Sequence, residues 1–169
     1  WVLEDTAGKV LVVNVAGYEV FAARNGTPFW RRRAVVGTQA RETPIFKASM
    51  TYLDLNPTWT VPPTILREDI LPKVRRDPGY LRSQNISVLD RKGRPVNAAA
   101  INWHAVGNRP PYILRQDPGP HNALGGIKFV LPNSHTVYLH DTPSRELFEK
   151  AERNFSSGCI RVDDPLSLA

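Results

Sequence analysis

The chain has 169 residues, enough for one well-packed domain and too few for two independent domains of ordinary size. Its hydrophobic content of 41% and charged content of 22% are typical of a globular protein. It contains no run of about 18 apolar residues, which a membrane-spanning helix requires. The net charge of +6 favours an anionic or zwitterionic partner. Its basic residues are scattered and no nucleic-acid-binding motif accompanies them, so we predict no nucleic-acid partner.

The first part of the chain has the alternation and the turn signals of antiparallel strands. We expect strands over 10–15, 18–23 and 30–37. Asn25-Gly26 lies between the second and the third, and both residues tolerate the positive φ of a hairpin turn. A loop over 38–44 should follow.

Prolines and short helical patterns set the middle of the chain apart, and we interpret 49–115 as an insertion. Helices are expected over 64–71 and 78–84, and a short strand over 86–89. Thr64 and Asp77 are the expected N-caps, the latter followed by proline. These signals predict a mixed, partly helical unit.

Three large aromatic residues of this insertion have two interpretations. Tyr52, Trp59 and Tyr80 either line a groove or pack the interior of the insertion, and the sequence leaves both open.

The last part of the chain returns to β-structure. Strands over 127–131 and 136–140 flank Pro132-Asn133-Ser134, which predicts an antiparallel hairpin. A helix is expected over 143–153, with Thr142 as its N-cap, and then a loop over 154–158. The predicted fold is mainly β (α+β) and mostly antiparallel, with one packing helix and the mixed insertion.

The second strand of this hairpin combines core residues with titratable ones. Val137 and Leu139 should point to one face of the sheet, and Tyr138 and His140 to the other. His140 lies at the end of the strand, where the sheet holds it firmly while leaving it open to a ligand. The alternation therefore predicts a functional site on the face opposite the core.

The single cysteine, Cys159, cannot form an internal disulfide and is either a buried filler or a reactive thiol. It follows Ser156-Ser157-Gly158, and a glycine before a nucleophile allows close backbone approach and presents N–H groups to an oxyanion. Ile160 and Val162 alternate with Arg161, so Cys159 and Arg161 should share one face of a short strand. A nearby cation would lower the pKa of the thiol.

A thiol, an imidazole and a guanidinium brought together would suit acyl transfer from a substrate that carries a carboxylate. His140 would take the thiol proton and return one to the leaving amine. Arg161 either binds the carboxylate or pairs with Asp163 or Asp164. The other histidines lack metal-ligand spacing, so we predict neither a metal nor a cofactor; they are His104, His121 and His135.

Two sequence segments together resemble the signature of the YkuD-type L,D-transpeptidases, which has a His, a spacer of about fifteen residues and Ser/Thr-His-Gly-Cys. They are Leu139-His140-Asp141-Thr142-Pro143 and Ser156-Ser157-Gly158-Cys159-Ile160-Arg161-Val162. The segment 121–129 is similar to the family's Asn-Pro-Leu-Gly stretch, and 56–63 to the start of the capping insertion of large Gram-negative members. Ser157 stands where many relatives have a second His, and Arg161 where some have Asn, so general-base duty is assigned to His140 alone.

The resemblance implies a β-sandwich or partly closed barrel, with a catalytic domain over 1–169 and a capping subdomain over 49–115 inserted in it. It implies Cys159 as nucleophile, His140 as general base and the main-chain carbonyl of Asp141 as the group that orients the imidazole. Gly158 and the Cys159 amide are the oxyanion candidates. The expected substrate-binding or loop-supporting residues are Tyr138, Arg161, Ser156, Ser157 and Trp59.

The resemblance also implies a reaction. A peptidoglycan tetrapeptide would acylate the cysteine and release D-Ala, and the amine of a second stem would resolve the thioester into a 3→3 cross-link. Carbapenems would act as covalent inhibitors, the location would be the periplasm, and a membrane anchor would lie upstream. Two alternatives stay open: an enzyme that attaches or hydrolyses lipoprotein–peptidoglycan links, and a non-catalytic module that binds the cell wall.

Overall fold

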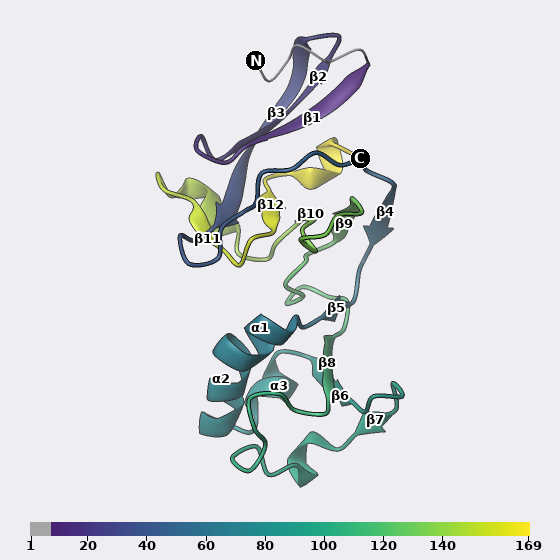
Figure 1. The fold of residues 1–169 in the computed structure, drawn as a ribbon, viewed down its shortest axis with the longest axis vertical. Helices are drawn as coiled ribbons and strands as arrows, with labels where there is room; N and C mark the ends of the chain where they lie inside the picture. The colour runs from purple at the N-terminus through teal and green to yellow at the C-terminus, as the bar shows by residue number, and fades with distance from the viewer. Residues whose placement is uncertain (1–7) are drawn as a thin grey trace. The chain divides into compact units, whose positions relative to one another are not determined.

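The computed structural model describes residues 8–169 of the chain, which forms two compact units (Figure 1). The larger unit runs to Leu55 and resumes from Ile127 to Ala169, and the smaller unit comprises Asn56–Gly126. The insertion expected over 49–115 overlaps the smaller unit, while Tyr52–Leu55 pair with Ile127–Val130 in the sheet of the larger one. In the part of the chain described here, no helix has the length and the apolar character needed to cross a membrane.

The larger unit is built on one eight-stranded sheet, whose strands run in the order β1-β2-β3-β12-β10-β9-β4, with β11 paired to β3. Their bounds are β1 (Lys9–Asn14), β2 (Glu19–Arg24), β3 (Thr27–Gly37), β4 (Tyr52–Leu55), β9 (Ile127–Val130), β10 (Leu139–His140), β11 (Asn154–Ser156) and β12 (Ile160–Val162). The predicted turn between β2 and β3 is present, with positive φ at Asn25 (48°) and Gly26 (79°). A short 3-10 helix, η4 (Pro165–Ser167), follows β12.

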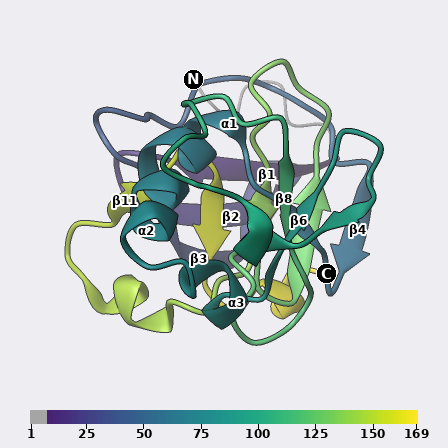
Figure 2. The ribbon, with the colours of Figure 1, turned by 90° about the horizontal axis from the view of Figure 1, so that it is seen from below.

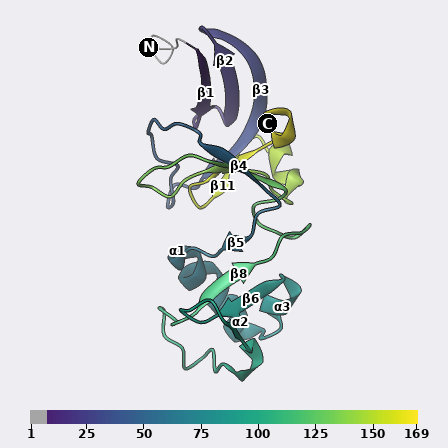
Figure 3. The same cartoon turned by 90° about the vertical axis from the view of Figure 1, so that its right-hand side faces the viewer.

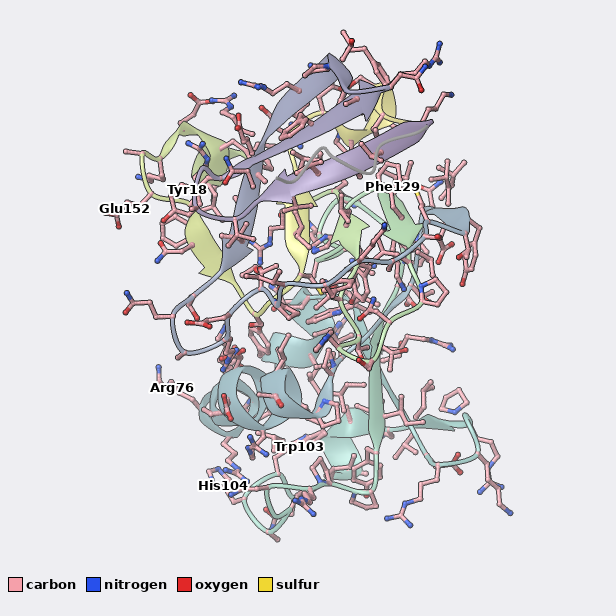
Figure 4. All side chains as sticks on the ribbon, turned by 45° about the horizontal axis from the view of Figure 1, so that its top comes forward. Tyr18, Arg76, Trp103, His104, Phe129 and Glu152 are labelled. Carbon is pink, nitrogen blue, oxygen red and sulfur yellow. The ribbon has the colours of Figure 1, made fainter. Side chains whose placement is uncertain are left out.

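Strand β3 belongs to both halves of this sheet (Figure 3). Its first part pairs with β2, and its later residues Ala34 and Val35 pair with β12. One core is shared by both halves, since Val20 of β2 belongs to the same buried cluster as Phe129 of β9 (labelled in Figure 4). The larger unit is therefore mainly β with alternating inward residues, and the predicted fold class is confirmed.

Two pairs of strands are parallel, although most of the sheet is antiparallel as expected. β10 pairs with β12 in parallel, and β11 with β3. After β10 the chain crosses back before entering the sheet again, so β12 runs in the same direction as β10. This return places the segment around Cys159 beside the segment around His140.

The helix predicted over 143–153 is wrong in length and in type. The structure has only a 3-10 helix, η3 (Arg145–Glu149), and its N-cap is Ser144, where Thr142 was expected. The backbone becomes extended at Lys150, and the amide of Val36 donates to the carbonyl of Arg153 over 2.8 Å. Pairing of this segment with β3 replaces further helical turns, and part of the expected loop over 154–158 becomes β11.

The smaller unit contains a four-stranded sheet in the order β5-β8-β6-β7 and a set of short helices (Figure 2). The elements are β5 (Trp59–Thr60), α1 (Pro63–Ile65), the π-helical turn η1 (Leu66–Ile70), α2 (Leu71–Arg76), α3 (Tyr80–Ser83), β6 (Ile86–Leu89), β7 (Pro95–Val96), the 3-10 turn η2 (Ala98–Ala100) and β8 (Ile113–Gln116). The strand expected over 86–89 is confirmed. The buried core of the smaller unit includes Trp103, which is labelled in Figure 4.

Both helix caps predicted in this unit are wrong. Pro62 is the N-cap of α1 and makes no side-chain cap, because the helix starts one residue before Thr64, at Pro63. The helix predicted over 78–84 starts only at Tyr80, as α3, and its N-cap is Gly79. Asp77 instead accepts a hydrogen bond from the Gly79 amide at 2.8 Å, in the turn before the helix. Trp59 and Tyr80 pack against the core of this unit. Packing in the interior of the insertion was one of the two interpretations that the sequence left open for them.

Candidate active site

Three cationic or ionisable side chains lie in one row across the sheet of the larger unit. His140 of β10 pairs with Lys128 of β9 on one side and with Arg161 of β12 on the other. The intervening residues of the same strands, Leu139 and Ile160 among them, are buried in the core. Because side chains alternate across a strand, the row occupies the face opposite the core. The sequence predicted this face for His140 and Arg161.

The imidazole of His140 is held in a single orientation. Its Nδ1 contacts the main-chain carbonyl oxygen of Asp141, and a carbonyl can only accept a hydrogen bond. Nδ1 therefore carries the proton, which leaves Nε2 as the basic nitrogen. The contact is the one that the family resemblance led us to expect.

Burial keeps this imidazole neutral. The side chain is 4% exposed, and burial, helped by the nearby charges of Arg161 and Lys128, lowers the pKa of His140 from 6.5 to about 3. At neutral pH the ring is therefore an uncharged proton acceptor, as a general base needs to be.

The thiol of Cys159 is also neutral in the resting protein. Burial raises the pKa of Cys159, although hydrogen bonds from Tyr138 and the charges of Lys128 and Arg161 act in the opposite direction. The expectation that nearby cations give a lowered thiol pKa is wrong in its net direction, because desolvation outweighs them. The residue remains partly accessible to solvent.

Tyr138 contacts both of these groups. Its ring lies edge-on to that of His140, with the ring centroids 5.7 Å apart, and it contributes main-chain and side-chain hydrogen bonds to the Cys159 thiol. The amide of Ile160 donates to the Tyr138 carbonyl over 3.1 Å, which sets Cys159 level with Tyr138 across the two strands. Lys128 Nζ lies 4.3 Å from the centroid of the tyrosine ring. The thiol and the imidazole are thus joined through one side chain.

The turn that carries the cysteine is braced from within by Ser156. The buried Ser156 hydroxyl donates to the carbonyl of Cys159 at 2.6 Å and accepts from the amide of Gly158 at 3.1 Å. Gly158 has a φ of +107°, in the left-handed region that favours glycine. Since the Gly158 amide already has a partner, the Cys159 amide is the better oxyanion donor of the two candidates.

The loop over 38–44 holds this turn from outside, which the sequence did not reveal. Thr43 donates to the carbonyl of Gly158 and accepts from the amide of Gly37, both at 2.9 Å. Arg41 Nη1 donates to the hydroxyl of Ser157 at 2.8 Å. No local sequence pattern indicates that a polar residue of this loop makes such contacts. Only its burial in the fold identifies Thr43 as a residue that supports the turn.

Arg161 does not pair with either acidic residue that follows it. Asp163 binds Arg33 and Arg145, and Asp164 binds Arg32. The Nε of Arg161 is buried and, within residues 8–169, has no hydrogen-bond partner. A buried donor without a partner is costly, so the guanidinium is available to an anionic ligand.

Three further observations bear on the predicted site. Lys128 was missed, although its place between apolar Ile127 and Phe129 on a strand indicates the face shared with His140. Among the described residues, no group of three or more His, Cys, Asp or Glu side chains is arranged to hold a metal ion. Trp59 belongs to the smaller unit, where it pairs with Gln116 in the sheet.

The comparisons with known proteins identify the family of the chain. The family model of YkuD, the L,D-transpeptidase catalytic domain, matches residues 8–169. A Haemophilus influenzae protein (strain ATCC 51907 / DSM 11121 / KW20 / Rd) that carries a provisional L,D-transpeptidase name is 40% identical over 159 residues, which cover 94% of this chain. The chain spans 32% of the length of that relative. The chain therefore belongs to the YkuD family of L,D-transpeptidase catalytic domains.

Proposed function

We propose that this domain forms 3→3 cross-links between peptidoglycan stems through a thioester on Cys159. The observation that carries the proposal is the group on β10 and β12, in which Tyr138 contacts the thiol and the ring of His140, and the Asp141 carbonyl binds Nδ1 of that ring. A neutral thiol beside a neutral base of fixed tautomer suits acyl transfer with proton transfer in the step of attack.

In the first half-reaction, the donor is a tetrapeptide stem that ends in D-Ala. Cys159 Sγ attacks the carbonyl between the L-centre of diaminopimelate and D-Ala while its proton passes to His140 Nε2. The Cys159 amide, with the Tyr138 hydroxyl as a second candidate donor, stabilises the oxyanion. The C–N bond then breaks, the proton on His140 moves to the leaving amine, and D-Ala departs from a thioester.

In the second half-reaction, the side-chain amine of diaminopimelate on another stem attacks the thioester carbonyl. His140 accepts a proton from this amine, and the C–S bond breaks as the amide forms. The proton on the imidazole returns to the sulfur, which restores the neutral pair. The product is a peptide bond between two diaminopimelate residues.

Arg161 has the position and the charge to bind a carboxylate of the donor stem. Its buried Nε lacks a partner and its charge acts on both Cys159 and His140. A carboxylate there would satisfy the guanidinium and place the scissile carbonyl next to the sulfur. Ser156 and Ser157 take part in the hydrogen bonds that hold the turn before Cys159.

The resemblance, together with a relative of much greater length, supports the assignment to the YcbB-like branch of large Gram-negative enzymes. The corresponding location is the periplasm, with a membrane anchor in a part of the protein upstream. Carbapenems would acylate Cys159, because their strained carbonyl can take the place of the donor's.

Mass spectrometry of muropeptides after incubation with purified tetrapeptide tests the proposal. We expect 3→3 dimers and free D-Ala from the wild type, and neither from Cys159→Ala. Release of D-Ala without dimers would identify a hydrolase, and no turnover by a folded wild type would favour a wall-binding module. An intact-mass increase after carbapenem exposure, lost in Cys159→Ala, tests the nucleophile separately.

A further inference from the structure

We propose that Arg145 and Asp163 are positioning residues, which hold Asp141 so that its carbonyl orients the imidazole of His140. The inference rests on the proposed function for its catalytic consequence. It concerns the carboxylate of Asp141, to which the family resemblance gave no catalytic role.

A continuous set of ion pairs connects Asp141, which follows β10, to Arg33 of β3. Arg145 Nη1 binds Asp141 Oδ1 at 3.1 Å, and its Nη2 binds Asp163 Oδ1. The other oxygen of Asp163 accepts from Arg33 of β3, at 3.0 Å from Nε and 2.9 Å from Nη2. Arg33 also binds Glu149 at 2.9 Å. We call Asp141, Arg145, Asp163 and Arg33 the bridging network.

The network is better placed than an ordinary surface ion pair. The side chain of Asp163 is 17% exposed and that of Asp141 is 25% exposed, so water screens them only in part. The guanidinium of Arg145 also lies 4.9 Å above the ring of buried Phe148. Asp163 is fixed by its backbone too, because its amide donates to the Arg33 carbonyl at 3.0 Å.

Asp141 is consequently held at two points besides its contact with the histidine. Its amide donates to the carbonyl of Ile127 at 2.9 Å, and its carboxylate is bound by Arg145. The amide and the carboxylate of Asp141 are therefore both held. The peptide plane that contains its carbonyl can still rotate, and this carbonyl is the group that binds His140 Nδ1. Releasing the carboxylate would loosen the carbonyl with respect to Nδ1.

A loosened carbonyl would change which ring nitrogen carries the proton. The Nδ1–H tautomer depends on its acceptor, and without one the Nε2–H tautomer becomes populated. That tautomer cannot accept the thiol proton, so the fraction of competent protein falls while the binding of substrate is unchanged.

The test compares Arg145→Gln with Arg32→Gln. Both remove an arginine that binds an aspartate near the end of the chain, since Arg32 binds Asp164 at 3.0 Å, but Arg32 does not belong to the bridging network. We expect Arg145→Gln to lower the rate of acylation on the order of tenfold, as loss of groups that orient a metal-bound histidine does. KM should stay unchanged, and Arg32→Gln should act like the wild type.

A second readout does not depend on turnover. The ¹⁵N NMR shifts of the His140 ring report its tautomer, and we expect Nδ1–H in the wild type and in Arg32→Gln, with a mixture in Arg145→Gln. Asp141→Asn keeps the main-chain carbonyl but weakens the ion pair with Arg145, so it should show the same mixture of tautomers. This variant replaces Arg145→Gln in the test if Arg145→Gln does not fold. Unchanged tautomers in both variants would overturn the inference, even in a protein whose wild type shows no transpeptidation.

Discussion

Tyr138 and Cys159 lie level with each other, each directly before one of the parallel strands β10 and β12, and hydrogen bonding from the tyrosine lowers the pKa of the thiol. The same tyrosine ring packs edge-on against His140. The pairing of β10 with β12 therefore sets the relation between Cys159 and His140, and the surrounding side chains set the pKa of each group.

Removing the tyrosine hydroxyl should make the thiol harder to ionise. The hydrogen bond from this side chain lowers the pKa of Cys159 against the effect of burial, so Tyr138→Phe should raise that pKa further. The pH dependence of alkylation by iodoacetamide measures it, and the midpoint should move upward relative to the wild type. Lys128→Met should move the midpoint in the same direction, because Lys128 also lowers the thiol pKa. A midpoint that falls in either variant would contradict this arrangement.

The wild-type thiol should show no reactive plateau at low pH. A thiolate–imidazolium pair reacts from about pH 5 upward, whereas a neutral pair reacts only as the thiol itself ionises. With the pKa of Cys159 raised above 9.0 and that of His140 lowered to about 3, alkylation should rise continuously through the alkaline range. A plateau near neutral pH in the free protein would show that the ion pair forms at rest.

Burial of neutral His140 should make the fold sensitive to acid. The folded pKa of about 3 lies below the unfolded value of 6.5, so between these values the unfolded chain binds a proton that the native state does not. The contribution to stability is complete above pH 6.5 and is lost as the pH falls toward 3, by roughly 5 kcal/mol in all. Urea unfolding between pH 7 and 4.5 should show a steeper decline for the wild type than for His140→Gln. Parallel curves would mean that the histidine is protonated in the native state.

Gly158→Ala should be more disruptive than Gly93→Ala, which adds a Cβ where nothing lies close to it. Gly158 has a positive φ, and an added Cβ would lie 3.3 Å from the carbonyl oxygen of Glu42. Gly93 also has a positive φ, of +77°, but nothing lies within 4 Å of its added Cβ. Gly93→Ala should therefore cost only the backbone strain, about 1 kcal/mol. Gly158→Ala should cost more and should also slow acylation, as thermal unfolding and carbapenem labelling would show.

The hydroxyl of Thr43 should matter to the nucleophile although it does not touch the sulfur. Thr43→Val removes the donor to the Gly158 carbonyl and leaves the amide of Gly37 without its acceptor, which should destabilise the fold by about 1–3 kcal/mol. Thr43→Ser keeps both bonds and is the matched control. If the valine variant is as stable and as reactive as the serine variant, the loop does not support the turn.

The sequence predicted those parts of the molecule that local patterns determine. Alternation placed Val137 and Leu139 in the core, and both are buried there. The Asn25-Gly26 pair predicted a hairpin turn, and the turn is present with the φ angles it requires. The faces of His140 and Arg161 followed from the same alternation, while their roles in catalysis stay predictions.

Features that depend on pairing between distant segments could not be predicted from the sequence. The stretch 143–153 has an apolar stripe, but its last residue, Arg153, and β11 directly after it bond to β3, and only the 3-10 helix η3 remains. The thiol pKa was expected to fall because cations are near, yet the depth of burial that reverses its direction is a property of the whole fold. Thr43 and the bridging network likewise join residues whose neighbourhood in space no local pattern reports.

The position of β12 has a consequence for the order in which the domain is assembled. This strand is the last of the sheet in chain order, yet it lies between β3 and β10 in the middle of it. During synthesis, the earlier strands emerge first and leave two unsatisfied edges until β12 enters between them. Cys159 directly precedes this strand, so the candidate nucleophile reaches its place beside His140 in the same step that completes the sheet.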